Sequence, residues 1–60
     1  MHGFEHLEQT LKSLDEIVLT SRTLLFHSKN NNQLGISKEL DQLKIDLEKY
    51  DEIIKNNPEF

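Results

Sequence analysis

The sequence predicts an all-α fold, an antiparallel hairpin of two helices. In both halves of the chain, apolar residues recur in alternating steps of three and four, which is the spacing of a heptad seam. A run of three asparagines, Asn30 to Asn32, separates the halves, and asparagine favours turns over helix. With 60 residues, the chain has room for one small domain.

The first helix is predicted over residues 4–27, because neither proline nor glycine interrupts this range. Ile17 and Leu24 widen its apolar stripe, as in a helix that packs against more than one neighbour. The seam itself, with a serine in its one polar position, consists of Phe4, Leu7, Leu11, Leu14, Val18, Ser21 and Leu25.

Residues 28–35, SKNNNQLG, are predicted to form a loop in which Gly35 gives the backbone freedom to bend. Asn31, Asn32 and Ser37 are the candidates for capping the next helix. That helix is predicted over residues 36–56, since Asn57-Pro58 stops it. Its coiled-coil-like seam is Ile36, Leu40, Leu43, Leu47, Tyr50 and Ile54.

A chain this short is marginally stable alone, and without cysteine it has neither disulfides nor thiolate metal sites. Self-association is the remaining support, and pairing two hairpins would give a four-helix bundle. A homodimer is therefore among the expected partners. The residues expected at that second contact are Ile17, Leu19, Leu24, Ile45 and Ile53.

The charge balance restricts the other partners. The net charge is -4, from 11 acidic and 7 basic residues, which disfavours binding to nucleic acid or to an anionic membrane surface. No apolar run is long enough to span a bilayer, and the first residues lack the features of a signal peptide. The sequence predicts a soluble, cytoplasmic protein with no membrane or nucleic-acid partner.

No enzyme signature of the nucleophile-elbow, phosphate-loop or zinc type is present. His2 and His6 have the spacing of helical metal ligands, but two ligands make an incomplete site. The sequence therefore predicts no metal or cofactor held by this chain alone.

The stretch SKELD, Ser37 to Asp41, lies near the start of the second helix. Ser37, Asp41, Lys44 and Glu48 recur at helical spacing and form a polar stripe beside the seam. A stripe of this kind is typical of a solvated flank with local pairs such as Asp41 with Lys44.

The stretch ISKELDQL also resembles the signature Ser-Gln-Glu-Leu-Asp of the aspartyl-phosphate phosphatases typified by stage zero sporulation protein E of bacilli. Ser37, Glu39, Leu40 and Asp41 match it, and Lys38 replaces the glutamine. The aliphatic, Arg and Leu pattern of that family's first helix is similar to Val18, Arg22 and Leu25.

Three features depart from the family pattern. The segment between Leu25 and Ser37 is several residues shorter, Lys44 stands where an apolar residue is usual, and the following aromatic, Tyr50, comes one turn late.

The resemblance implies a negative regulator of a sporulation phosphorelay, whose substrate and partner is a phosphorylated response regulator. Asp41 would be the catalytic residue that orients the attacking water. Ser37, Lys38, Glu39 and Lys44 would contact the partner, and the partner would supply Mg²⁺.

Two other functions remain open. One is a non-enzymatic helical adaptor or assembly subunit that docks on partner helices through its apolar stripe. The other is a hairpin dimer that binds structured RNA, which the acidic balance disfavours.

Overall fold

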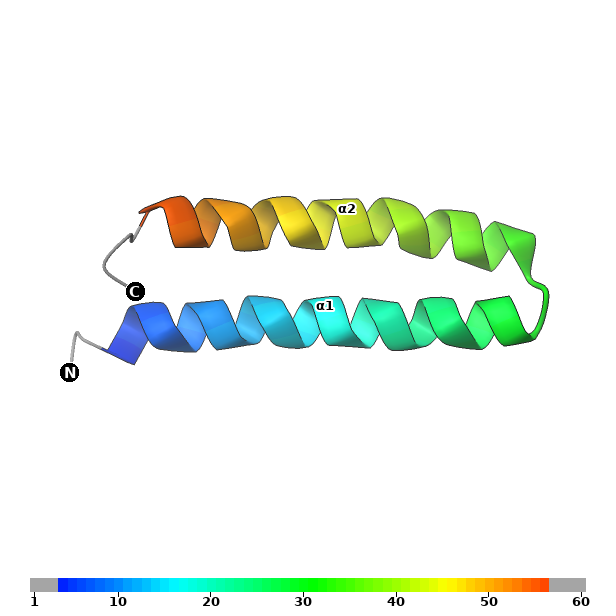
Figure 1. Cartoon of the computed structure of the whole chain (residues 1–60), viewed down its shortest axis with the longest axis horizontal. Coiled ribbons are helices and arrows are strands. Elements are labelled where there is room, and N and C mark those ends of the chain that lie inside the picture. The colour runs from blue at the N-terminus through cyan, green and yellow to red at the C-terminus, as the bar shows by residue number, and fades with distance from the viewer. Residues whose placement is uncertain (1–3, 57–60) are drawn as a thin grey trace.

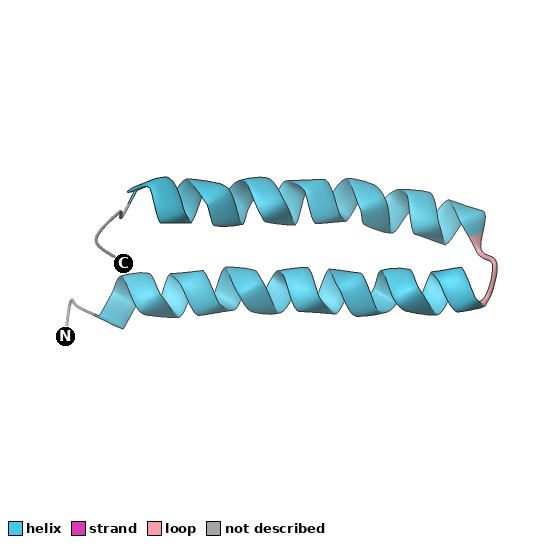
Figure 2. Ribbon diagram, in the orientation of Figure 1, coloured by secondary structure: helices cyan, strands magenta, loops and turns pink. Residues whose placement is uncertain are grey.

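The computed structural model describes residues 4–56, which form two helices. Helix α1 spans Glu5–Lys29 and helix α2 spans Gln33–Asn56. They lie side by side and antiparallel, so that the start of α1 and the end of α2 share one end of the molecule (Figure 1). The described residues contain no strand (Figure 2). The predicted all-α helical hairpin is confirmed.

The connection between the helices is shorter than the loop predicted over residues 28–35, because it occupies only residues 30–32. At the end of α1, the Asn32 N–H donates to the His27 carbonyl at 2.9 Å, and the Asn31 N–H donates to the Ser28 carbonyl at 3.2 Å. Asn31 has a left-handed φ of 54°, which asparagine tolerates. This bonding pattern ends a helix within three residues.

Asn32 starts α2 directly, which settles the choice among the candidate caps. Its Oδ1 accepts a hydrogen bond from the Gly35 N–H at 3.1 Å, the usual bond of an asparagine N-cap. Residues 33–35 therefore belong to the helix, and Gly35 has no positive φ. Glycine is needed there for space: a Cβ atom would lie 2.6 Å from Cγ of His27 and 2.8 Å from Nδ2 of Asn32.

The contact between the helices has a polar centre. Among residues 4–56, the buried side chains are those of Thr10, Ser13, Thr20 and Asp46, and no apolar side chain is fully buried. Each of the three hydroxyls donates a hydrogen bond, two of them to carbonyls of α1 itself. Small side chains on this stripe let two helices approach closely.

The predicted seam forms the contact between the helices only in part: Leu7 of α1 is partly buried, and so are Ile36, Leu43, Tyr50 and Ile54 of α2. Leu11, Val18 and Leu25 are half exposed, as are Leu40 and Leu47 of α2. Conversely, Ile17, Leu24 and Ile53, which we expected at a second contact, are partly buried. Leu19 and Ile45, the other two residues expected at a second contact, are exposed. Helix α1 is rotated by about one residue, ~100°, from the predicted orientation. Helix α2 is rotated by less, because Ile36, Leu43 and Tyr50 of its predicted seam stay partly buried.

None of the helices in residues 4–56 combines the length and the apolar character needed to cross a membrane.

Candidate functional site

The stretch SKELD lies on α2, just beyond its first turn. Ser37, Lys38 and Asp41 are exposed, and so is Lys44 one turn further along. Because Ser37, Asp41 and Lys44 follow one another at intervals of four and three residues, they share the side of α2 that faces away from α1. The structure therefore brings these three residues together on an open helical surface.

Glu39 is separated from that surface. It stands two turns before the buried Asp46 on the same side of α2 and is partly buried. Ser37 and Asp41 point the other way, because two residues along a helix turn the side chain by about 200°. A partner that contacts Ser37 and Asp41 therefore meets the outer face of α2, while Glu39 lies toward α1.

The Asp41 carboxylate forms no hydrogen bond and no ion pair within the part of the chain that the structure describes. The local pair with Lys44 that a solvated flank would favour is absent. Asp41 thus presents both carboxylate oxygens to solvent as hydrogen-bond acceptors.

A buried polar cluster, missed by the sequence reasoning, joins the helices near their middle. The Thr20 hydroxyl donates to Oδ2 of Asp46 at 2.5 Å, and Nε2 of Gln42 donates to Oδ1 at 2.9 Å. The hydrogen bond from Thr20, that from Gln42 and the charge of Lys49 together lower the pKa of Asp46 below its ordinary value of 3.8, although burial opposes this. The available signal was the spacing of Thr10, Ser13 and Thr20, which places three small polar residues on one helix face.

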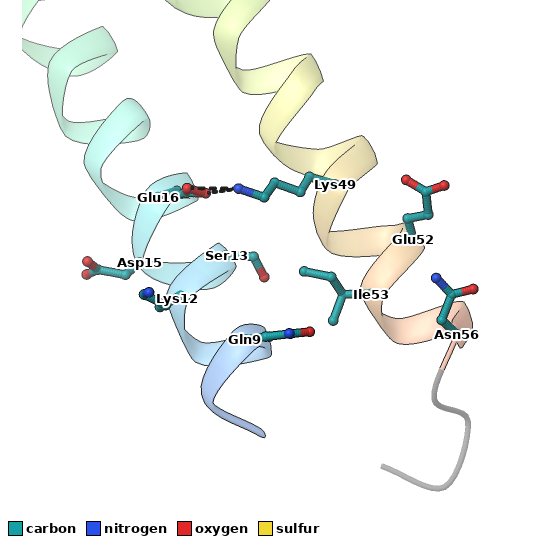
Figure 3. A pocket seen from close by; sticks show the side chains of 9 residues that line it. All are labelled: Gln9, Lys12, Ser13, Asp15, Glu16, Lys49, Glu52, Ile53 and Asn56. Carbon is teal, nitrogen blue, oxygen red and sulfur yellow. Dashed lines mark hydrogen bonds and ion pairs between the residues drawn. The ribbon is translucent and has the colours of Figure 1, made fainter. Parts of the chain in front are cut away.

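A shallow groove of about 580 Å³ lies at the open end of the hairpin, away from SKELD (Figure 3). Lys49 reaches across its rim from α2 and pairs with Oε1 of Glu16 on α1 at 3.1 Å. Ser13 and Ile53 lie between the helices below this pair. Its mixed charge and open shape give it no preference for one class of ligand.

The part of the chain that the structure describes contains no group of three or more His, Cys, Asp or Glu side chains that could hold a metal ion. His6 is partly buried on α1. His2, its neighbour in the candidate pair, lies outside the described residues.

Comparison with known proteins does not assign this chain to a family. No protein-family model, no curated protein and no solved structure matches the chain.

Proposed function

We propose that this chain dephosphorylates the aspartyl-phosphate of a response regulator, as a cytoplasmic negative regulator of a sporulation phosphorelay. The observation that carries the proposal is Asp41, the last residue of the matching signature, which is exposed and has no partner within the described residues. A carboxylate in that state is available to a water molecule on another protein.

The reaction takes place in the partner's active site. The grooves described within residues 4–56 are open and do not enclose a substrate, so a convex helix inserted beside the phosphoryl group is the arrangement that the shape of the hairpin permits. Water attacks phosphorus in line, the bond between phosphorus and the aspartyl oxygen breaks, and inorganic phosphate leaves. The partner supplies the Mg²⁺ that stabilises the charge on the phosphoryl oxygens.

The side chains around Asp41 take separate tasks in this proposal. Asp41 accepts a hydrogen bond from the attacking water and orients it. Ser37 lies one turn before it, where its hydroxyl can bond a loop of the partner. Lys38 and Lys44 are exposed cations that attract the phosphoryl group or acidic partner residues. Glu39 is partly buried on the side of α2 that faces α1, so it contacts the partner only at the edge of the interface.

A mixing assay tests the proposal. Receiver domains of response regulators are phosphorylated with a small phosphodonor, freed of the donor, and mixed with the chain in the presence of Mg²⁺. We expect the phosphorylated form to be lost faster with the wild-type chain and at the spontaneous rate with Asp41→Asn. Glu48→Gln is the matched control, because it removes an exposed charge from the same face two turns away and should keep the activity.

Activity that survives in a folded Asp41→Asn protein would refute Asp41 as the group that orients water. A wild-type chain that leaves every tested receiver domain phosphorylated would refute the phosphatase function itself.

An adaptor function is the second candidate, because part of each seam is exposed. Leu11, Val18 and Leu25 on α1 and Leu40 and Leu47 on α2 offer apolar surface for other helices. An adaptor would retain its partner when Asp41 is changed and lose it when a seam leucine is changed. The phosphatase proposal instead expects that changing Asp41 abolishes dephosphorylation and that changing an exposed seam leucine preserves it.

A further inference from the structure

One face of the hairpin carries the half-exposed seam residues of both helices. Each exposed seam residue follows a residue of the contact between the helices by one position: Leu11 follows Thr10, Val18 follows Ile17, and Leu47 follows Asp46. One position turns a side chain by about 100° in the same rotational sense on both helices. Because α1 and α2 are antiparallel, that rotation brings the two seams to the same face.

We propose that a second copy of this chain covers this face and forms a four-helix bundle in which the two loops lie at opposite ends. In this arrangement α1 packs antiparallel against α1 of the second copy, and α2 packs antiparallel against α2. The proposal rests on apolar exposure, charge and register and not on the phosphatase function. It pairs Lys44 with the second copy and leaves Lys38 as the exposed cation close to Asp41.

The charges beside the seam of α1 fit this partner. Glu8, Asp15, Arg22 and Lys29 recur every seven residues on the outer side of the seam, and all are exposed. Charges at such positions set the partner and the orientation of packed helices. The order of signs, two negative and then two positive, makes α1 complementary to an antiparallel copy of itself. Glu8 then meets Lys29 of the second copy, and Asp15 meets its Arg22.

The corresponding positions of α2 follow the same rule. Lys44 and Asp51 are exposed and stand seven residues apart on the outer side of the second seam. In an antiparallel pair of α2 helices, Lys44 of each copy meets Asp51 of the other. Asp51 also pairs with Lys55 on its own helix, at 3.0 Å on the surface, and can accept from both lysines.

The two sets of pairs require the same symmetry axis. The pairs on α1 are centred between Val18 and Leu19, and the pair on α2 is centred between Leu47 and Glu48. Within one hairpin, Thr20 bonds Asp46 and Glu16 bonds Lys49. These bonds place the two centres beside each other, so a single two-fold axis perpendicular to the helices satisfies every pair.

The alternative bundle, with both loops at the same end, opposes like charges. There, α1 of one copy would pack against α2 of the other in the register of the hairpin. Asp15 would face Asp51 and Arg22 would face Lys44. Opposed like charges are destabilising and discriminate against wrong pairings, so the charge pattern selects the arrangement with loops at opposite ends.

The size of the face suits a dimer. The described hairpin extends 45 Å by 17 Å along its two longer axes, and its half-exposed seam residues run from Leu11 to Leu25 and from Leu40 to Leu47, so a second copy can form a long contact on this face. Burying the half-exposed seam residues supplies the association free energy, and the ion pairs mainly fix the orientation. Asp41 stays on the outer surface of such a bundle. It follows Leu40 by one residue, which rotates its side chain by about 100° further away from the contact between α1 and α2.

Charge reversal tests the pairing. Asp15 and Arg22 are seven residues apart and do not contact each other within one helix, so any coupling between them is intermolecular. By sedimentation equilibrium we expect a wild-type dimer. Arg22→Glu should raise the dimer dissociation constant by roughly tenfold or more, since two attractive pairs become repulsive. Asp15→Arg should do the same, and an equimolar mixture of the two variants should recover wild-type association.

Lys12→Glu is the matched control, because it changes the charge of α1 by the same amount on a different side of the helix and should leave the dimer intact. Two results would overturn the proposal: a folded wild-type chain that stays monomeric at several hundred micromolar, or a mixture of the two variants that associates no better than either alone.

The orientation has its own measurement. Since the chain lacks cysteine, Leu34→Cys gives one spin-label site beside the loop at an exposed position outside the seam. Loops at opposite ends predict a label separation approaching the 45 Å length of the hairpin. A separation below about half of that length would show both loops at the same end and overturn the arrangement.

Discussion

Asp46 and Thr20 illustrate how single residues hold the helices in register. Their hydrogen bond of 2.5 Å is the buried side-chain bond between α1 and α2 in the described residues. A hydrogen bond to a charged acceptor stabilises a protein by about 1.5–3 kcal/mol, and loss of the donor leaves the carboxylate partly unsatisfied. The cluster therefore combines a stability role with a register role.

Thr20→Val tests this cluster through its pH dependence. The pKa of Asp46 is lowered in the folded protein, so the stabilisation is fully present above the ordinary value of 3.8 and disappears as pH falls through the lower folded value. At pH 7, Thr20→Val should reduce the free energy of unfolding by about 1–3 kcal/mol. The difference in the free energy of unfolding between wild type and Thr20→Val should become smaller below about pH 4.

Urea unfolding of both proteins at equal concentration, measured from pH 7 to pH 3, provides the comparison. Subtracting the variant from wild type removes the titration of the other carboxylates. A gap that stays constant over this range would contradict the role of the Asp46 carboxylate.

At the scale of elements, the short connection depends on Asn32 and Gly35. Asn32→Ala removes the cap of α2 and should lower the free energy of unfolding by about 1 kcal/mol. Gly35→Ala would normally stabilise a helix, yet here it should destabilise, because its Cβ would meet the His27 ring. Thermal unfolding followed by circular dichroism measures both changes.

Ser37→Ala is the control for these two variants, since Ser37 is exposed and lies inside α2 rather than at its cap. Its midpoint should stay close to that of wild type. If Gly35→Ala raised the midpoint, the close approach of His27 would not limit this position.

At the scale of the whole molecule, the exposure of the seam links stability to concentration. If the seam is covered by a second copy, the thermal midpoint should rise with protein concentration. Leu47→Gln should abolish the rise, because it places a polar amide at the centre of the covered face. Leu34→Gln, at an 86% exposed position outside the seam, should preserve it. Calorimetry over a hundredfold range of concentration distinguishes these outcomes.

The effect of truncating Leu14 or Leu43 also depends on association. If they formed the core of a single hairpin, Leu14→Ala and Leu43→Ala would each lower the free energy of unfolding by about 2–4 kcal/mol. Leu14 is 38% exposed in the hairpin and Leu43 is partly buried. We therefore expect the full loss in the free energy of unfolding only in the dimer, where the second copy covers these side chains.

The sequence by itself determined the two helices and the site of the break between them. The heptad spacing and the asparagine run are local signals, and helix formation and termination depend on neighbouring residues. The same local pattern put Ser37, Asp41 and Lys44 on one face of the second helix, where the structure finds them.

Only the tertiary structure decided which face of each helix meets the other. A wide apolar stripe satisfies the same period whether its centre or its edge faces the partner helix, so periodicity alone left the choice open. It placed the contact face of α1 one residue away from the observed one and that of α2 closer to it. Thr20 and Asp46, 26 residues apart in sequence, meet only when the stripe of Thr10, Ser13 and Thr20 on α1 faces the side of α2 that carries Asp46. That long-range hydrogen bond and the small side chains of α1 fix the rotation of the helices. They leave part of each apolar seam half exposed, namely Leu11, Val18 and Leu25 on α1 and Leu40 and Leu47 on α2.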